Sequence, residues 1–153
     1  MGDRSYVSLW IYDIPERIAE DVLEVLDDYG FTTYGTEPFT VATMLEVVDN
    51  KDIFFIEEAS LSTADEVSDK LESLGVTHQS HQDPRYEYAG DLHRFHPDLG
   101  RWDSDANADA DAIISAFQFR YKMRSMNDFW VKVQLGITYE DKFRELTGQK
   151  PLT

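Results

Sequence analysis

The chain contains no cysteine among its 153 residues. This absence excludes disulfide bonds, thiolate nucleophiles and zinc sites built on cysteine. No stretch approaches the roughly 18 unbroken apolar residues that a membrane-spanning helix needs. Met1 to Arg4 lead directly into a strand-like run, so we expect no signal peptide. Together these absences predict a cytoplasmic protein, in its own cell or in an infected host.

Basic residues are scarce. The sequence has 14 lysines and arginines against 30 aspartates and glutamates, and its net charge is −16. Phosphate backbones and anionic membranes repel such a chain unless its cations cluster, and the densest group, Arg120, Lys122 and Arg124, is small. We expect no direct nucleic-acid or membrane partner, and a protein partner should present a basic surface. The alternative is that the acidity serves solubility or a salt-rich cytoplasm.

Motifs of several enzyme classes are also missing. The sequence has no Gly-rich phosphate loop, no nucleophile elbow and no H-E-x-x-H metal motif. This favours a non-enzymatic protein without a cofactor. Apolar residues, in contrast, make up 42% of the chain, which is enough for a folded core.

The pattern of apolar residues predicts an α+β protein. A first helix begins at Asp13-Ile14-Pro15-Glu16 and ends at Gly30, and a second begins at Thr63 and ends at Gly75. Strands are predicted at Tyr6–Tyr12, Phe39–Val48, Asp52–Glu58, Arg85–Ala89 and Leu92–His96, with hairpin turns at Asp49-Asn50-Lys51 and Gly90-Asp91.

The order strand, helix, strand, strand, helix, strand is the split βαβ order of the ferredoxin-like fold. An internal echo supports it, because Gly30-Phe31-Thr32 and Gly75-Val76-Thr77 each follow a similar helix. The predicted sheet is antiparallel and contains Tyr6–Tyr12, Phe39–Val48, Asp52–Glu58 and Arg85–Ala89. Both helices should pack on one face.

Residues 1–100 are predicted to form this domain, and residues 101–153 a helical, aromatic-rich C-terminal extension that packs on the same unit. Asp103–Asp111 is small and acidic, as in a loop or linker. Ile113, Phe117 and Tyr121 then follow helical spacing, and a last helix contains Phe143 and ends at Gly148. We expect the extension to cover the other face of the sheet, or to build a homodimer across it.

Acidic residues line both predicted helices. On the first, Glu16, Glu20 and Glu24 lie four residues apart, and like charges at that spacing repel one another. A helix advances roughly 6 Å over four residues, so the stripe presents regularly spaced negative charge, as a nucleic-acid backbone does. The predicted partner-binding residues are Glu16, Glu20, Asp21, Glu24, Asp27, Asp28, Asp65, Asp69 and Glu72.

All four histidines form two H-x-x-H pairs, and imidazole is a common ligand of zinc, nickel and copper. The metal hypothesis joins His78, His81, His93 and His96. Residues three apart on a strand face opposite sides of the sheet, so exposed loop histidines without metal are the favoured interpretation.

Asp13 ends the first predicted strand and suits the N-cap of the first helix. Tyr12-Asp13-Ile14-Pro15, followed by the helix and Tyr29-Gly30-Phe31, resembles the opening of the small CRISPR adaptation subunit family. The resemblance covers residues 4–31. It implies a ferredoxin-like fold, two chains paired side by side, and a metal held by Asp13 for phosphodiester cleavage. The first helix departs from that family, which grips DNA through basic surfaces.

The segment from Tyr86 to Gly100, with its Pro97-Asp98-Leu99-Gly100, is similar to small uncharacterised actinobacterial phage proteins. The favoured function is therefore a non-enzymatic acidic binding protein. It would be a phage or mobile-element accessory protein that mimics DNA and occupies or inhibits a basic, nucleic-acid-binding host protein. The alternatives are a metal-dependent phosphodiesterase or nuclease that uses Asp13, and a bacterial immunity or antitoxin protein.

Overall fold

The computed structural model describes residues 4–34, 39–86, 88–114 and 135–150. Its strands are β1 (Arg4–Asp13), β2 (Phe54–Ser60), β3 (Thr77–Gln82), β4 (Gly90–His96), β5 (Gly100–Ala106) and β6 (Ala112–Ile113). Its helices are the 3-10 turn η1 (Glu16–Ile18), α1 (Ala19–Tyr29), α2 (Val41–Asp49), α3 (Thr63–Ser73) and α6 (Ile137–Leu146). The protein is α+β, as the sequence predicts.

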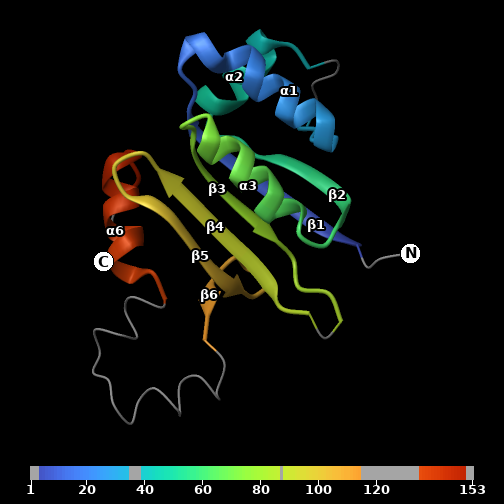
Figure 1. The fold of residues 1–153 in the computed structure, drawn as a ribbon, viewed down its shortest axis with the longest axis vertical. Coiled ribbons are helices and arrows are strands. Elements are labelled where there is room, and N and C mark those ends of the chain that lie inside the picture. Colours follow the sequence, from blue (N-terminus) through green and yellow to red (C-terminus); the bar gives the residue numbers. More distant parts are fainter. Residues whose placement is uncertain (1–3, 35–38, 87, 115–134, 151–153) are drawn as a thin grey trace.

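The strands form one antiparallel sheet in the order β2-β1-β3-β4-β5-β6 (Figure 1). β1 is an internal strand: Leu9 pairs with Phe54 of β2 on one side and with Ser80 of β3 on the other. The predicted strand Tyr6–Tyr12 is therefore confirmed, and it lies inside the sheet.

The ferredoxin-like arrangement is formed by β1, α1, a short bridge at Thr32, β2, α3 and β3. Thr32 pairs antiparallel with Phe55, and each backbone amide donates to the other's carbonyl at 2.9 Å. Because β2 lies between this bridge and β1, and β3 lies on the far side of β1, the order in space is that of the split βαβ unit. Thr32 and Thr77, the equivalent positions of the sequence echo, both enter the sheet.

The second strand of this unit is thus a single bridge, and the predicted strand Phe39–Val48 is wrong. That segment contains α2, whose N-cap Thr40 forms a capping box with Thr43. Its β-branched residues favour a strand locally, but Met44, Val47 and Val48 have helical spacing and are buried together. Asp49-Asn50-Lys51 is consequently the end of a helix and not a hairpin turn.

The fourth strand is also displaced from its predicted position. Arg85–Ala89 lies in the connection between β3 and β4, where Arg85 and Tyr88 form an isolated bridge. The fourth strand is instead β3. Its sequence, THQSHQ, is polar, so the sequence pattern did not indicate that this strand is buried. Its His78, Ser80 and Gln82 side chains are buried because they form hydrogen bonds with polar groups of α3 and neighbouring strands. Leu92–His96 is confirmed as part of β4.

The hydrophobic core lies between the sheet and its helices. Val7, Leu9 and Ile11 alternate along β1 and are almost fully buried. The same core contains residues of three helices: Val22 and Leu26 of α1, Met44 and Val47 of α2, and Val67 and Leu71 of α3. The two predicted helices therefore pack on one face, with α2 beside them (Figure 1).

The C-terminal part of the chain adds two strands to the sheet and one helix, α6, to the face opposite the core. β5 and β6 extend the sheet into the segment assigned to a loop and a helix, so Asp103–Ala106 and Ile113 are strand residues. Phe143 of α6 is 1% exposed and packs edge-on against Tyr12, which points away from the core of β1. The rest of the predicted helix through Phe117 and Tyr121, and the cations at 120–124, lie outside the described residues. The division at residue 100 stays a prediction.

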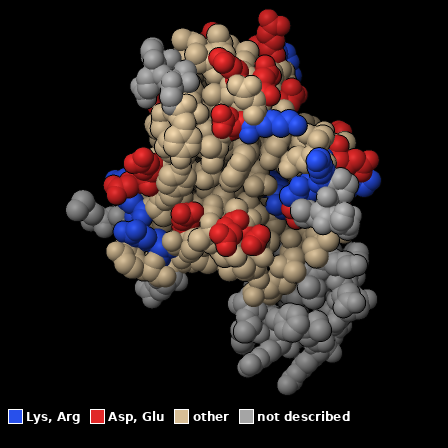
Figure 2. Space-filling model, turned by 180° about the vertical axis from the view of Figure 1, so that it is seen from behind, with Lys and Arg blue, Asp and Glu red and all other residues tan. Residues whose placement is uncertain are grey.

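Seen from behind, the face of the sheet opposite α3 carries mostly uncharged side chains across its centre (Figure 2). In the part of the chain that the structure describes, no helix has the length and apolar character needed to cross a membrane.

Candidate functional site

The acidic residues of the first helix are exposed. Glu16 lies on η1, and the regular four-residue spacing belongs to Glu20, Glu24 and Asp28 of α1. These acidic side chains face solvent because Val22 and Leu26, on the opposite face of α1, pack in the core. Within the described residues, none of the acidic side chains of η1 and α1 forms an ion pair or hydrogen bond.

A shallow groove runs between α1 and α3, with a volume of about 300 Å³. Its lining consists of Asp21, Glu24, Val25, Asp28, Lys70, Ser73 and Leu74. Three of the predicted partner-binding residues are in this lining, and their carboxylates stand beside apolar side chains. An aliphatic chain that ends in a cation matches this combination of surfaces.

Three acidic residues of α3 have a different environment, because Arg101 of β5 reaches across to them. Its Nη2 lies 2.8 Å from Asp65 Oδ1, and its Nη1 lies 2.9 Å from Asp69 Oδ1 and 3.1 Å from Glu72 Oε2. Its Nε lies 2.6 Å from Asp103 Oδ1 on the same strand. The predicted partner-binding set therefore divides into carboxylates of η1 and α1 that form no ion pair among the described residues, and carboxylates of α3 that share Arg101.

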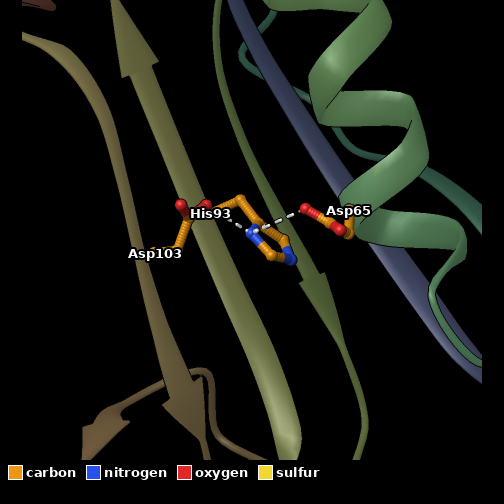
Figure 3. A group of neighbouring side chains, drawn as sticks. All are labelled: Asp65, His93 and Asp103. Atoms are coloured by element: carbon orange, nitrogen blue, oxygen red, sulfur yellow. Dashed lines mark hydrogen bonds and ion pairs between the residues drawn. The ribbon is translucent and has the colours of Figure 1, made fainter.

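His93 lies next to the second group, between Asp65 and Asp103 (Figure 3). It is 5% exposed, and both ring nitrogens face carboxylates: Nδ1 is 2.7 Å from Asp103 Oδ1 and 3.9 Å from Asp65 Oδ1, and Nε2 is 2.5 Å from Asp91 Oδ2. Burial lowers the pKa of His93, but the hydrogen bonds to Asp103 and Asp91 outweigh it and raise the pKa to about 9. A doubly protonated ring donates to both carboxylates.

The electrostatics of the neighbouring groups agree with this charge state. Burial raises the pKa of Asp103, but His93 and Arg101 outweigh it and lower the pKa below its ordinary value. Burial lowers the pKa of Arg101, and its hydrogen bonds to Asp103 and Asp69 more than compensate. Two cations are thus held among carboxylates from three elements, α3, β4 and β5.

The three other histidines lie apart from this group. His78 is buried against α3, where Nδ1 is 2.8 Å from the Val76 carbonyl and Nε2 is 2.9 Å from Ser68 Oγ. Its strand neighbour His81 points to the opposite face and donates to the Asn107 carbonyl at 2.8 Å. His96 accepts from the Asp98 amide at 3.0 Å. The four histidines therefore do not form one metal site, and the group whose ligand atoms converge in the described residues is Asp65, His93 and Asp103.

Asp13 is exposed at the end of β1. It lines a pocket of about 230 Å³ together with Asp49 and Lys51. It does not cap the first helix, because η1 begins after Pro15 without any side-chain cap. The pocket has no histidine in its lining, so the structure does not join Asp13 to the histidines.

Comparisons of the chain with protein-family models, curated proteins and solved structures find no match.

Sequence reasoning missed Arg101 and did not join Asp103 to His93. The available signal was alternation: Asp91 and His93 on one strand, and Arg101 and Asp103 on the next, lie two residues apart and share a face. The hairpin between β4 and β5, in which His93 pairs with Asp103, brings these two pairs together.

Proposed function

We propose that the protein is a non-enzymatic acidic binding protein that occupies a basic, nucleic-acid-binding partner through α1. In this proposal it is a phage or mobile-element accessory protein, and it acts in the host cytoplasm as an inhibitor that mimics DNA. The binding residues are Glu16, Glu20, Asp21, Glu24, Asp27 and Asp28.

One observation carries the proposal: the carboxylates of η1 and α1 have no cationic partner among the described residues, whereas those of α3 share Arg101. Like charges four residues apart cost a helix a few tenths of a kcal/mol per pair. On α3, Arg101 of the neighbouring strand β5 forms ion pairs with three acidic side chains. No such ion pair offsets the charges of α1 among the described residues. An external cation would relieve this repulsion.

The groove between α1 and α3 supports the type of partner. Its lining combines the carboxylates of Asp21, Glu24 and Asp28 with the apolar side chains of Val25 and Leu74, and it also includes Lys70. Lysine and arginine bury their aliphatic stems on apolar surface while their charged ends remain at polar groups. Lysine- or arginine-rich surfaces that normally contact phosphates should therefore fit this side of the molecule.

The test compares two charge-matched double variants. Glu20→Gln with Glu24→Gln changes the stripe, and Glu57→Gln with Glu58→Gln removes the same charge from exposed positions of β2. A partner captured by the wild-type protein is purified, and its affinity for the three proteins is measured from about 0.05 to 0.5 M salt, over which the Debye length falls several-fold.

We expect the α1 variant to bind much more weakly, the β2 variant to bind nearly as the wild type does, and wild-type affinity to fall steeply with salt. The wild type should also displace DNA from the partner. Equal weakening by both variants, or affinity that does not respond to salt, would refute the proposal. A wild-type protein that folds only in molar salt would instead show that the acidity is an adaptation to salt.

A further inference from the structure

We propose that Asp65, His93 and Asp103 form a binding site for one divalent transition-metal ion, and that Arg101 occupies this position when the ion is absent. This inference is independent of the proposed function. It rests on the α3 side of the molecule, whereas the partner-binding proposal rests on α1.

The ligand atoms converge from three elements. Asp65 comes from α3, His93 from β4 and Asp103 from β5, and one ligand atom of each lies within 4.8 Å of the others (Figure 3). The Nδ1 atom of His93 faces Asp103 and Asp65, while both carboxylates are about half exposed, so an ion can enter from solvent. A first-row divalent ion would bridge the three and keep water in its remaining positions.

The Nε2 atom of His93, which faces away from the proposed metal position, makes a carboxylate contact typical of metal-bound imidazoles. Its Nε2 donates to Asp91 Oδ2 at 2.5 Å, and this contact holds the ring and its Nδ1 in one orientation. A carboxylate on the distal nitrogen commonly orients histidine ligands and makes them more basic. Asp91 is therefore the orienting residue of the proposed site.

Arg101 already places a cation at this position. Its Nη2 is 3.4 Å from His93 Nδ1 and 2.8 Å from Asp65 Oδ1, and its Nε is 2.6 Å from Asp103 Oδ1. On metal binding, the ion replaces the Nδ1 proton of His93 and these guanidinium contacts. Arg101 would keep its ion pairs with Asp69 and Glu72, which its Nη1 atom forms.

The charge balance leaves room for a divalent ion. Five carboxylates surround the two cations: Asp65, Asp69, Glu72, Asp91 and Asp103. Arginine and a protonated histidine neutralise two of these five charges. One imidazole with two carboxylates suits ions such as Zn²⁺ and Mn²⁺.

The experiment titrates the full chain with Zn²⁺ by calorimetry at constant ionic strength. We expect one ion per chain, at least tenfold weaker binding in His93→Gln, and binding weakened roughly tenfold or more in Asp91→Asn, as for other outer carboxylates. His96→Gln is the matched histidine control and should bind as the wild type does.

Arg101→Gln gives the most specific result. Removing the internal competitor should strengthen Zn²⁺ binding, whereas Lys70→Gln, which removes the same charge from α3, should leave the affinity nearly unchanged. Equal gains in both variants would indicate general attraction to an acidic surface and would overturn the proposal. So would undiminished binding in His93→Gln, or absence of binding in both the wild type and Arg101→Gln.

A second measurement avoids variants that fail to fold. In wild-type protein, substoichiometric Mn²⁺ should broaden the ring resonances of His93 before those of His96. Simultaneous broadening of both rings would contradict the site.

Discussion

The buried ring of His78 should make the protein less stable in mild acid. The ring has no exposed surface, and its Nδ1 donates to the Val76 carbonyl at 2.8 Å. Its Nε2 is therefore unprotonated and accepts from the Ser68 hydroxyl at 2.9 Å. Burial lowers the pKa of His78 to about 4, and the hydrogen bond to Val76 offsets only part of this effect.

The sign follows from the two pKa values. In the unfolded chain His78 has the ordinary pKa of 6.5, so as pH falls the unfolded state binds the proton first. The stability that the neutral ring contributes is complete above this value and is lost between about pH 6.5 and pH 4. Linkage gives a loss of about 2 kcal/mol from this one group between about pH 7.5 and pH 5.

Other groups titrate over the same range, so the measurement is a difference. Urea unfolding of the wild type and of His78→Gln is compared at both pH values. The variant should be less stable at about pH 7.5, and the gap between the two proteins should shrink by about 2 kcal/mol at about pH 5, because only the wild type carries the histidine.

A gap that is the same at both pH values would refute the reasoning. The ring can also be followed by NMR in the wild type alone, where its signals should remain those of a neutral imidazole at about pH 5.5. A midpoint near the ordinary value would show that burial does not control this group.

Three further predictions test the fold. Thr40→Ala removes the cap of α2 and should cost about 1 kcal/mol in urea unfolding, whereas no loss would speak against the capping box. Gly90→Ala should cost about 1–3 kcal/mol, because its Cβ would lie 2.6 Å from the Gln82 carbonyl oxygen and 2.8 Å from that of Ala106; an unchanged melting temperature would show that β3, β4 and β5 are not so close. Phe143→Ala should cost about 3–5 kcal/mol if α6 packs on Tyr12, and a loss under about 1 kcal/mol would contradict that packing.

The elements that sequence predicted correctly are those whose local pattern and tertiary environment agree. Val7, Leu9 and Ile11 alternate along a strand that is buried on one face, and Val22 and Leu26 repeat at helical spacing before Gly30. The order of the predicted elements, together with the echo between the helix ends, predicted the ferredoxin-like fold, although two strands counted in that order lie elsewhere in the structure.

Two strands were misplaced where local pattern and environment disagree. Phe39–Val48 is rich in β-branched residues, but the capping box and the packing of Met44 and Val47 make it a helix. β3 has no apolar residue, and its polar side chains are buried through hydrogen bonds to groups distant in sequence. Partners distant in sequence leave no periodic signal in the strand itself.

The acidity of the surface follows from composition, and so does the exposure of the α1 stripe, because helical spacing determines which side chains share a face. The tertiary structure alone decided how these charges are partnered. The β4–β5 pairing sets His93 beside Asp103, and the packing of α3 over those strands brings Asp65, Asp69 and Glu72 to Arg101. Net charge can be counted from the sequence. An ion pair, however, needs two side chains within about 4 Å of each other, and only the fold sets that distance.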